Sequence, residues 1–241
     1  MSDSLSLLLS AVLAWLVGSI PFSLLIAKWI AGIDLREHGS RNVGATNVAR
    51  TVGAKWGLAA LVFDAIKGIL PVVLLPLVFP VPTEWMTHQR VLCGVAAILG
   101  HMFPPWLGFR GGKGVATSLG IVAVLSPWST LVAFISFVVT FAGSRIVSLS
   151  SIVAALAFAV SQLLRFGNDL WTAATWSMGV FSIAIPAMII FRHRTNLGRL
   201  WRGEEPKLAL GRKASASTSS EPDRVESESC DRNTRDFEKA P

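Results

Sequence analysis

Long apolar runs separated by short polar segments make up most of the first two hundred residues. Seven runs are candidate helices: Leu5 to Ile30, Val52 to Val78, Val91 to Leu107, Val115 to Leu125, Thr130 to Gly143, Ser150 to Leu164 and Leu170 to Phe191. A helix needs roughly 20 apolar residues to cross a membrane. The fourth and fifth runs are shorter, and Ser126-Pro127-Trp128 between them fits either a turn or a kink in one long helix. Hydropathy alone therefore allows six or seven spans.

The distribution of Lys and Arg favours seven spans. With seven, the loops on one side carry most of the cations, from Lys28 and Arg36 to Arg202, and the other side receives only Arg90 and Arg165. Lys and Arg concentrate in cytoplasmic loops. The sequence therefore predicts an all-α integral membrane protein, a bundle of seven transmembrane helices with the N-terminus outside and the C-terminus in the cytoplasm.

Composition supports the membrane class and predicts a domain boundary. The chain is 52% hydrophobic and 15% charged, whereas soluble domains carry about 25% charged residues. Residues 203–241 are polar and are predicted to be a disordered cytoplasmic tail behind a membrane domain of residues 1–202. Cys93 and Cys230 lie too far apart to indicate a disulfide framework. The net charge of +7 is explained by anionic lipid headgroups, without nucleic acid.

Three polar clusters stand at the ends of apolar runs, and seven spans place all three on the cytoplasmic face. The first, residues 40–47, offers neutral donors from Ser40, Asn42, Thr46 and Asn47, next to Gly44 and ahead of Arg50. Arginine can bind phosphate through two parallel hydrogen bonds. The alternative interpretation is a polar loop whose arginines only set the topology.

The second cluster, Gly111-Gly112-Lys113-Gly114, leads into an apolar helix, whose N-terminus favours anions. It lacks the spacing of a nucleotide P-loop, and a tight turn between helices is the alternative. In the third cluster, His193 and Asn196 share a helix face, and His193 fits a proton carrier, a phosphate donor or an interfacial anchor. Ser150 and Ser151 offer hydroxyls, or are simple helix caps.

Other features narrow the chemistry. Asp64 and Lys67 lie three residues apart inside the second apolar run, and mutual pairing is the expected reason. The sequence has no Gly-x-Ser-x-Gly elbow, and no histidine is followed five residues later by aspartate, which disfavours serine hydrolases and one large class of acyltransferases. No residue set has the spacing of a catalytic metal site, so neither a metal nor another cofactor is expected.

Several separated motifs resemble the bacterial acyl-phosphate-dependent glycerol-3-phosphate acyltransferases, the PlsY family. They are residues 18–22, 32–36, 38–40, 42–47, 63–64 with 67–68, 111–117 and 193–194 with Asn196, so the resemblance runs from the first span to Leu200. One departure is visible: Arg41 stands where the family usually has glycine. A positive φ at that position would strain an arginine.

The resemblance implies a bacterial inner-membrane enzyme with its active site facing the cytoplasm. It would transfer a fatty acyl group from acyl phosphate to the 1-hydroxyl of glycerol 3-phosphate, yielding lysophosphatidic acid and phosphate without a cofactor. The implied partners are these substrates, membrane lipids and the enzyme that supplies acyl phosphate. A carrier for phosphorylated solutes is the second hypothesis, although no internal repeat supports it, and a structural scaffold would leave the three polar clusters unexplained.

Our site hypothesis assigns the clusters to two phosphates. The acyl phosphate is assigned to Ser40, Asn42, Thr46, Lys113 and the amides of residues 111–114, and glycerol 3-phosphate is assigned to Arg50, Asn196 and Ser151. The predicted catalytic residues are His193, Ser40, Lys113 and Asn196, and either His193 or a substrate phosphate accepts the proton. The predicted substrate-binding residues are Asn42, Gly44, Thr46, Asn47, Arg50, Gly111, Gly112, Gly114, Ser150 and Ser151.

Overall fold

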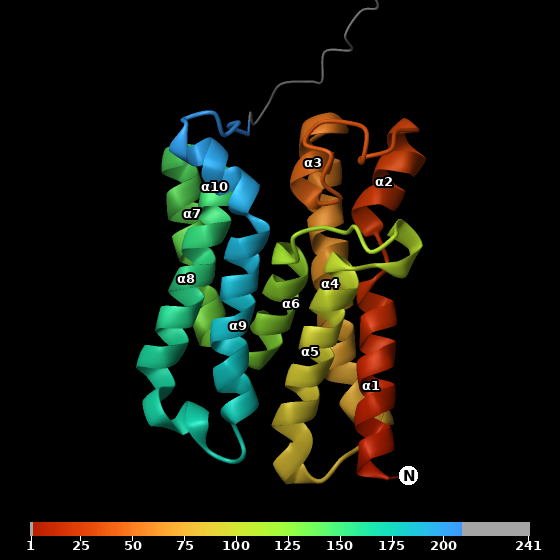
Figure 1. Ribbon diagram of the computed structural model, residues 1–241, viewed down its shortest axis with the longest axis vertical. Helices are drawn as coiled ribbons and strands as arrows, with labels where there is room; N and C mark the ends of the chain where they lie inside the picture. Colours follow the sequence, from red (N-terminus) through yellow and green to blue (C-terminus); the bar gives the residue numbers. More distant parts are fainter. Residues whose placement is uncertain (1, 209–241) are drawn as a thin grey trace, which may run out of the picture.

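The computed structural model describes residues 2–208, which form a bundle of helices (Figure 1). The α-helices are α1 Asp3–Gly18, α2 Phe22–Ala31, α3 Ala45–Thr51, α4 Ala54–Val78, α5 Met86–Met102, α6 Val115–Leu125, α7 Pro127–Ser144, α8 Val147–Phe166, α9 Trp176–Arg192 and α10 Arg194–Trp201. Short 3-10 turns are η1 Thr83–Trp85, η2 Pro105–Leu107 and η3 Gly167–Trp171. The prediction of an all-helical protein with several apolar helices is confirmed.

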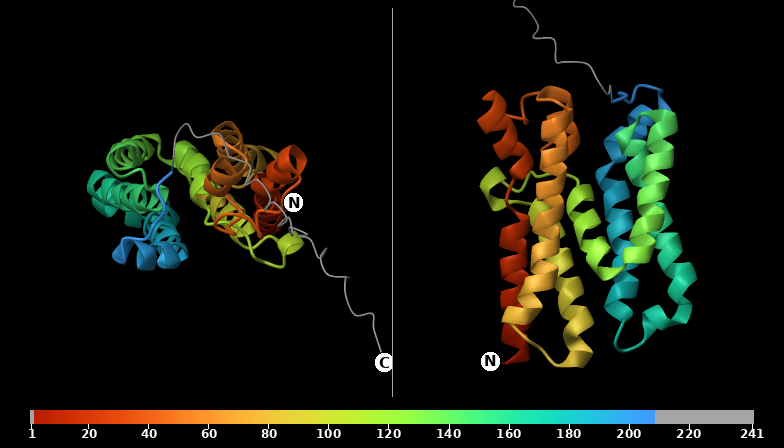
Figure 2. Two further views of the ribbon diagram at one scale, coloured as in Figure 1. Left: turned by 90° about the horizontal axis from the view of Figure 1, so that it is seen from above. Right: turned by 180° about the vertical axis from the view of Figure 1, so that it is seen from behind.

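Helix length supports five or six membrane spans within residues 2–208. Five segments are long and apolar enough, and α9 with α10, bent by 59°, is a sixth candidate. Helix α6 has 11 residues and rises only about 16 Å, about half of a hydrocarbon core of about 30 Å. Helices α6 and α7 run in opposite directions (Figures 1 and 2), so Ser126 lies in a turn and not in a kink.

Several boundaries differ from those predicted. The first apolar run is interrupted, because α1 ends at Gly18 and α2 begins only after Pro21, and proline has no N–H to continue a helix. The Trp106 indole nitrogen lies 3.1 Å from the Ser19 carbonyl oxygen and 2.8 Å from the Ser19 hydroxyl oxygen. It therefore gives the Ser19 carbonyl a hydrogen-bond donor where the helix is interrupted. The last run becomes helical at Trp176, since Leu170 lies in the turn η3.

The buried charges of α4 are paired, as predicted. Lys67 Nζ lies 2.7 Å from Asp64 Oδ1, and both side chains are 2% exposed. Lys67 also donates to the Ile20 carbonyl at 2.7 Å, and the Ser23 hydroxyl donates to Asp64 Oδ2 at 3.0 Å. Backbone groups inside a membrane need a partner from the protein. The ion pair therefore holds α4 against the interruption between α1 and α2.

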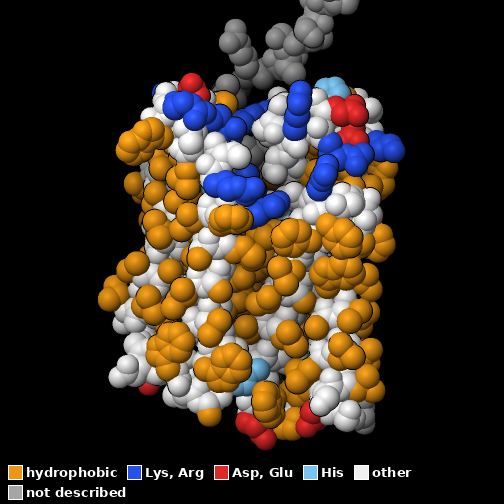
Figure 3. All heavy atoms as spheres, in the orientation of Figure 1, with side chains coloured by type: hydrophobic (Ala, Val, Ile, Leu, Met, Phe, Trp, Pro, Cys, Tyr) orange, Lys and Arg blue, Asp and Glu red, His pale blue; other side chains and the backbone are white. Residues whose placement is uncertain are grey.

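Lys and Arg side chains gather at one end of the bundle, which we call the basic end (Figure 3). The N-terminus lies at the opposite end, while α2, α3 and α10 lie at the basic end (Figures 1 and 2). A main core between α1, α4, α5, α6, α8 and α9 contains the buried Ile98, Ile121 and Phe181. A smaller core around Leu35 and Val48 supports the first polar loop from below.

The predicted start of the tail needs a correction. Residues 203–208 pack onto the basic end, where the Leu208 amide donates to the Arg145 carbonyl at 2.8 Å and Glu205 is 8% exposed. Sequence composition missed this because a few specific contacts, and not average hydrophobicity, hold the segment. The rest of the predicted tail, residues 209–241, lies outside the described residues.

Candidate active site

A chain of hydrogen bonds at the basic end joins the second and third polar clusters to the segment after α10. Lys113 Nζ donates to Asn196 Oδ1. The Asn196 amide nitrogen donates to Glu205 Oε1 at 2.5 Å. Because a lysine can only donate and a carboxylate can only accept, these two contacts fix the orientation of the amide. We call Lys113, Asn196 and Glu205 the central array.

Glu205 also receives donors from α8 and from a second position on α10. The Ser148 hydroxyl donates to Oε1 at 2.8 Å, and Arg199 Nε lies 2.7 Å from Oε2. Burial alone would raise the pKa of Glu205, but the hydrogen bonds from Asn196, Arg199 and Ser148 outweigh it and lower the pKa below its ordinary value. The carboxylate therefore stays charged at neutral pH and fixes α8 and α10 around Asn196.

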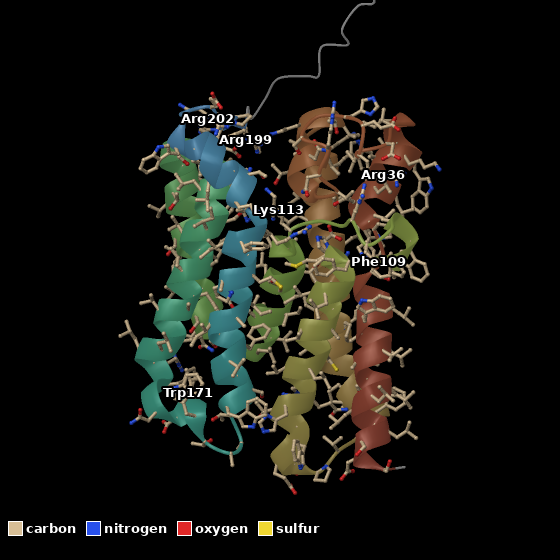
Figure 4. All side chains as sticks on the ribbon, in the orientation of Figure 1. Arg36, Phe109, Lys113, Trp171, Arg199 and Arg202 are labelled. Carbon is tan, nitrogen blue, oxygen red and sulfur yellow. The ribbon has the colours of Figure 1, made fainter. Side chains whose placement is uncertain are left out.

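The environment of Lys113 is strongly positive. Burial is the main reason that its pKa falls to about 8, and the cations Arg199, Arg192 and Arg50 lower it further, while Glu205 opposes them. Four cations thus face one carboxylate. Figure 4 places Lys113 and Arg199 at the basic end, between α10 and the α3 side of the bundle. The Lys113 ammonium has three N–H donors and uses one on Asn196, so two stay available for an anion.

The glycine loop is held by its own backbone. The Gly111 amide donates to the Met102 carbonyl at 3.0 Å, the Gly112 amide donates to the His101 carbonyl at 3.2 Å, and Arg192 binds both glycine carbonyls. These two amides are therefore occupied within the protein, contrary to our hypothesis that they bind phosphate. The amides of Lys113 and Gly114, by contrast, have no acceptor among residues 2–208.

Two positions of this loop require glycine for specific structural reasons. A Cβ on Gly112 would lie 2.2 Å from His101 Nε2 and 2.6 Å from the Val43 carbonyl oxygen. Only glycine therefore lets the first and second loops approach at this point. Gly114 has φ +81° immediately before α6, a conformation that glycine adopts at little cost.

Asn47 organises the first loop. Its Oδ1 accepts from the Ser40 amide at 3.0 Å, and its Nδ2 lies within 3.2 Å of the carbonyl oxygens of Leu35, His38 and Asn42. The side chain is 1% exposed. The structure therefore gives Asn47, predicted to bind substrate, a role in positioning the loop.

The other donors of the first loop have no partner among residues 2–208. The side chains of Ser40, Asn42 and Thr46 make no hydrogen bond there, and because none of the three is buried, a ligand can reach them. They extend from the segment that Asn47 fixes, next to Gly44, the N-cap residue of α3. This leaves three neutral donors at the basic end.

Arg41 has φ +56°, in the left-handed region. The departure from the family pattern therefore falls at a position that favours glycine, as the sequence analysis anticipated. The exposed side chain makes no hydrogen bond or ion pair within residues 2–208. The strain is thus not offset by a contact of the guanidinium.

Arg50 and His193 border the central array. Arg50 donates to the Pro206 carbonyl at 2.9 Å, while its buried Nε has no hydrogen-bond partner within residues 2–208. His193 is 3% exposed, and its Nδ1 lies 2.8 Å from the Ile189 carbonyl oxygen. That carbonyl requires a proton on Nδ1, so the neutral ring has an unprotonated Nε2.

The serines of α8 divide into two kinds. Ser150 and Ser151 lie inside α8, so they are not helix caps, and their hydroxyls donate to the carbonyls of Ile146 and Val147 in the preceding turn. Ser148 instead faces Glu205. Sequence reasoning missed Glu205 completely and gave no role to Arg192, because both gain significance only through residues distant in the chain.

No group of three His, Cys, Asp or Glu side chains within the described part of the chain is arranged to hold a metal ion. The site consists of cations, amides and hydroxyls, which suit phosphate.

Fold and site together define an integral membrane protein with a cluster of cations and neutral donors at one end of its helical bundle. The family model described as glycerol-3-phosphate acyltransferase matches residues 8–203. A glycerol-3-phosphate acyltransferase of Anaeromyxobacter sp. (strain Fw109-5) is 41% identical over 87% of this chain and 100% of that protein. The enzyme of the same name from Myxococcus xanthus (strain DK1622) is 45% identical over 80% of this chain and 95% of that one.

A crystal structure of PlsY, an integral membrane glycerol 3-phosphate acyltransferase, in its glycerol 3-phosphate form is similar with a TM-score of 0.74 and 39% identity, covering 85% of this chain and 96% of that one. Its lysophosphatidic acid form gives a TM-score of 0.71 and 37% identity over 84% and 95%. The chain belongs to the glycerol-3-phosphate acyltransferase family, the PlsY family.

Proposed function

We propose that the protein transfers a fatty acyl group from acyl phosphate to the 1-hydroxyl of glycerol 3-phosphate, giving lysophosphatidic acid and inorganic phosphate. The observation that carries the proposal is the central array, in which Lys113 and Asn196 meet among four cations at one end of an apolar bundle. Related structures are described as glycerol 3-phosphate and lysophosphatidic acid forms, which fits the acceptor and the product.

The electrostatics suit a reaction between two anions. Each substrate carries a phosphate, so the site must overcome their mutual repulsion and hold both in reacting geometry. Arg50 supplies charge for the glycerol 3-phosphate headgroup. Lys113, predicted above to bind acyl phosphate, is assigned to glycerol 3-phosphate as well, because it contacts Asn196 and lies near Arg50. Ser40, Asn42 and Thr46, whose side chains have no partner within residues 2–208, supply neutral donors for the acyl phosphate and for the oxyanion that forms on its carbonyl.

His193 is the candidate group for the 1-hydroxyl. Its Nε2 is free to accept a hydrogen bond, because Nδ1 is committed to the Ile189 carbonyl. The hydroxyl oxygen attacks the acyl carbon, the bond from that carbon to the phosphate oxygen breaks, and Nε2 takes the hydroxyl proton. Phosphate is a good leaving group, so its departure requires no strong acid. Asn196, three residues away on α10, links this step to Lys113.

We propose the following topology. The apolar segments α1 with α2, α4, α5, α6, α7, α8 and α9 pass between the two ends alternately, which gives seven crossings, with α6 completed by the loop before it. The concentration of Lys and Arg at the basic end makes that end cytoplasmic by the positive-inside rule. The N-terminus then lies outside the bacterial inner membrane, and the active site faces the cytoplasm.

A direct assay tests the reaction. Purified protein is incubated with labelled glycerol 3-phosphate and palmitoyl phosphate, and lysophosphatidic acid is measured, with palmitoyl-CoA as the alternative donor. His193→Ala should lower turnover roughly 100-fold, as expected for loss of a general base. His38→Ala is the matched control, because within residues 2–208 the His38 side chain hydrogen-bonds only to the Asp34 carbonyl of its own loop. A drop of only a few-fold with an unchanged pH profile rejects His193 as the base, and product formed only from palmitoyl-CoA rejects acyl phosphate as the donor.

A further inference from the structure

A second site candidate lies at the end of the bundle opposite the basic end. A groove of about 580 Å³ runs along α7 and α8, lined by Trp128, Val132, Ala157, Val160, Ser161, Leu164 and Arg165. Its volume lies within the range of about 300–1,000 Å³ that small-molecule sites occupy. The function proposed above makes no use of this groove.

Arg165 stands at this groove without a partner in the described chain. Its guanidinium lies 5.8 Å from the ring centre of Trp128 and 5.4 Å from that of Phe166. It makes no hydrogen bond or ion pair with any of residues 2–208. A guanidinium whose faces pack on aromatic rings keeps its N–H edges free, and these edges match the oxygen atoms of a phosphate.

The surroundings place Arg165 at the depth of lipid headgroups. Trp85, Trp128, Trp171 and Trp176 are each about half exposed and lie near the ends of apolar helices. Tryptophan is enriched where a membrane meets water. Trp171 marks this end of the bundle in Figure 4. The groove wall of Val160 and Leu164, 53% and 82% exposed, lies on the hydrocarbon side of that level.

We propose that this groove binds an anionic phospholipid of the leaflet opposite the active site, with the headgroup phosphate on Arg165 and an acyl chain along Val132, Ala157 and Val160. The combination of an unpartnered cation at the interface and an adjoining apolar groove carries the assignment. A second copy of this chain is a poorer occupant, because a two-fold contact centred here would bring two Arg165 guanidinium groups together.

Native mass spectrometry of the purified full-length protein tests the site with phosphatidylglycerol as the probe. Diacylglycerol with the same acyl chains and inorganic phosphate serve as partial ligands. We expect retention of phosphatidylglycerol but of neither partial ligand. Arg165→Gln should weaken retention about tenfold or more, since hydrogen bonds to charged groups are lost. Val160→Trp, which fills the groove, should have a similar effect.

Matched variants separate a specific site from general effects. Arg90→Gln removes the other cation of this end, and Val139→Trp adds the same bulk at an exposed position of α7 outside the groove. Both should retain phosphatidylglycerol as the parent chain does. The proposal is overturned if Arg165→Gln or Val160→Trp retains phosphatidylglycerol as well as the parent does, or if the parent retains diacylglycerol equally well. A dimer that forms without lipid and is lost in Arg165→Gln also overturns it. If Arg165→Gln does not yield folded protein, Arg165→Lys, which keeps the charge but not the planar fork, should weaken retention measurably.

Discussion

Replacing Arg41 by glycine should stabilise the protein. Arg41 has φ +56°, and its exposed side chain has no hydrogen bond or ion pair within residues 2–208. The left-handed conformation costs a residue with a Cβ about 1–2 kcal/mol. Glycine relieves this strain but adds about 0.4–1 kcal/mol of freedom to the unfolded chain. The net gain is therefore about 0.5–1 kcal/mol.

Thermal unfolding in detergent, followed by tryptophan fluorescence, measures this gain. A change of 1 kcal/mol shifts the Tm of a protein of this size by about 2–4 °C, so Arg41→Gly should raise the Tm by about 1–4 °C. Arg110→Gly is the matched control. Arg110 is also an exposed loop arginine, but it is not among the residues with positive φ, so its replacement adds only the entropy of glycine and should lower the Tm.

The reasoning fails if Arg41→Gly lowers the Tm as much as Arg110→Gly does, because the left-handed backbone would then not be a source of strain. Kinetics add a second check. Since the Arg41 side chain has no partner within the described chain, the KM for each substrate should change less than twofold in Arg41→Gly. A rise in the KM for acyl phosphate alone would instead assign the guanidinium to that substrate.

Three further predictions concern charged groups. Lys113 has a pKa of about 8 and loses its charge above it, so the KM for glycerol 3-phosphate should rise with pH above about 8. Lys113→Arg should flatten this rise. A KM that stays constant for the parent protein from pH 7 to 9.5 contradicts the assignment. Glu205→Gln should move the rise to lower pH, since Glu205 raises the pKa of Lys113, whereas Glu204→Gln, at an exposed pair with Arg202, should not. Lys67→Met leaves the buried Asp64 carboxylate without its cation and should lower the free energy of unfolding by about 3–5 kcal/mol. The Tm should fall on the order of 10 °C, and neutralising Asp64 as well should partly restore it. An unchanged Tm means that the ion pair contributes little to stability.

The apolar helices and the polar clusters could be predicted from the sequence because both are local signals. The bounds Val115–Leu125 of α6 agree with the predicted run, since Gly114 and Pro127 limit it on either side. Asp64 and Lys67 were predicted to pair because the membrane leaves buried charges few other options. Arg41 was identified from a single departure in a motif, and the backbone angle confirmed its significance.

The missed features depend on contacts between distant segments. Glu205 lies in a polar stretch whose composition resembles a tail, and only the fold brings it to Ser148 and Asn196. The Gly111 and Gly112 amides, which we predicted to bind phosphate, donate to backbone carbonyls for a related reason. The backbone amides of a glycine loop can donate to any nearby acceptor, and here the carbonyls of His101 and Met102 at the end of α5 accept them.

The charge balance of the basic end explains why a carboxylate, Glu205, lies in the candidate site although both proposed substrates are anions. Burying Lys113 beside Arg50, Arg192 and Arg199 without any carboxylate would lower its pKa further and favour the neutral amine. One carboxylate keeps the ammonium charged but does not neutralise the four cations. The remaining positive charge is available to phosphate groups, and because it is shared by several residues, substrate affinity should weaken as salt is added. Glu205 thus keeps Lys113 in the cationic form that attracts phosphate. Because Glu205 does not neutralise all four cations, positive charge also remains for the substrates.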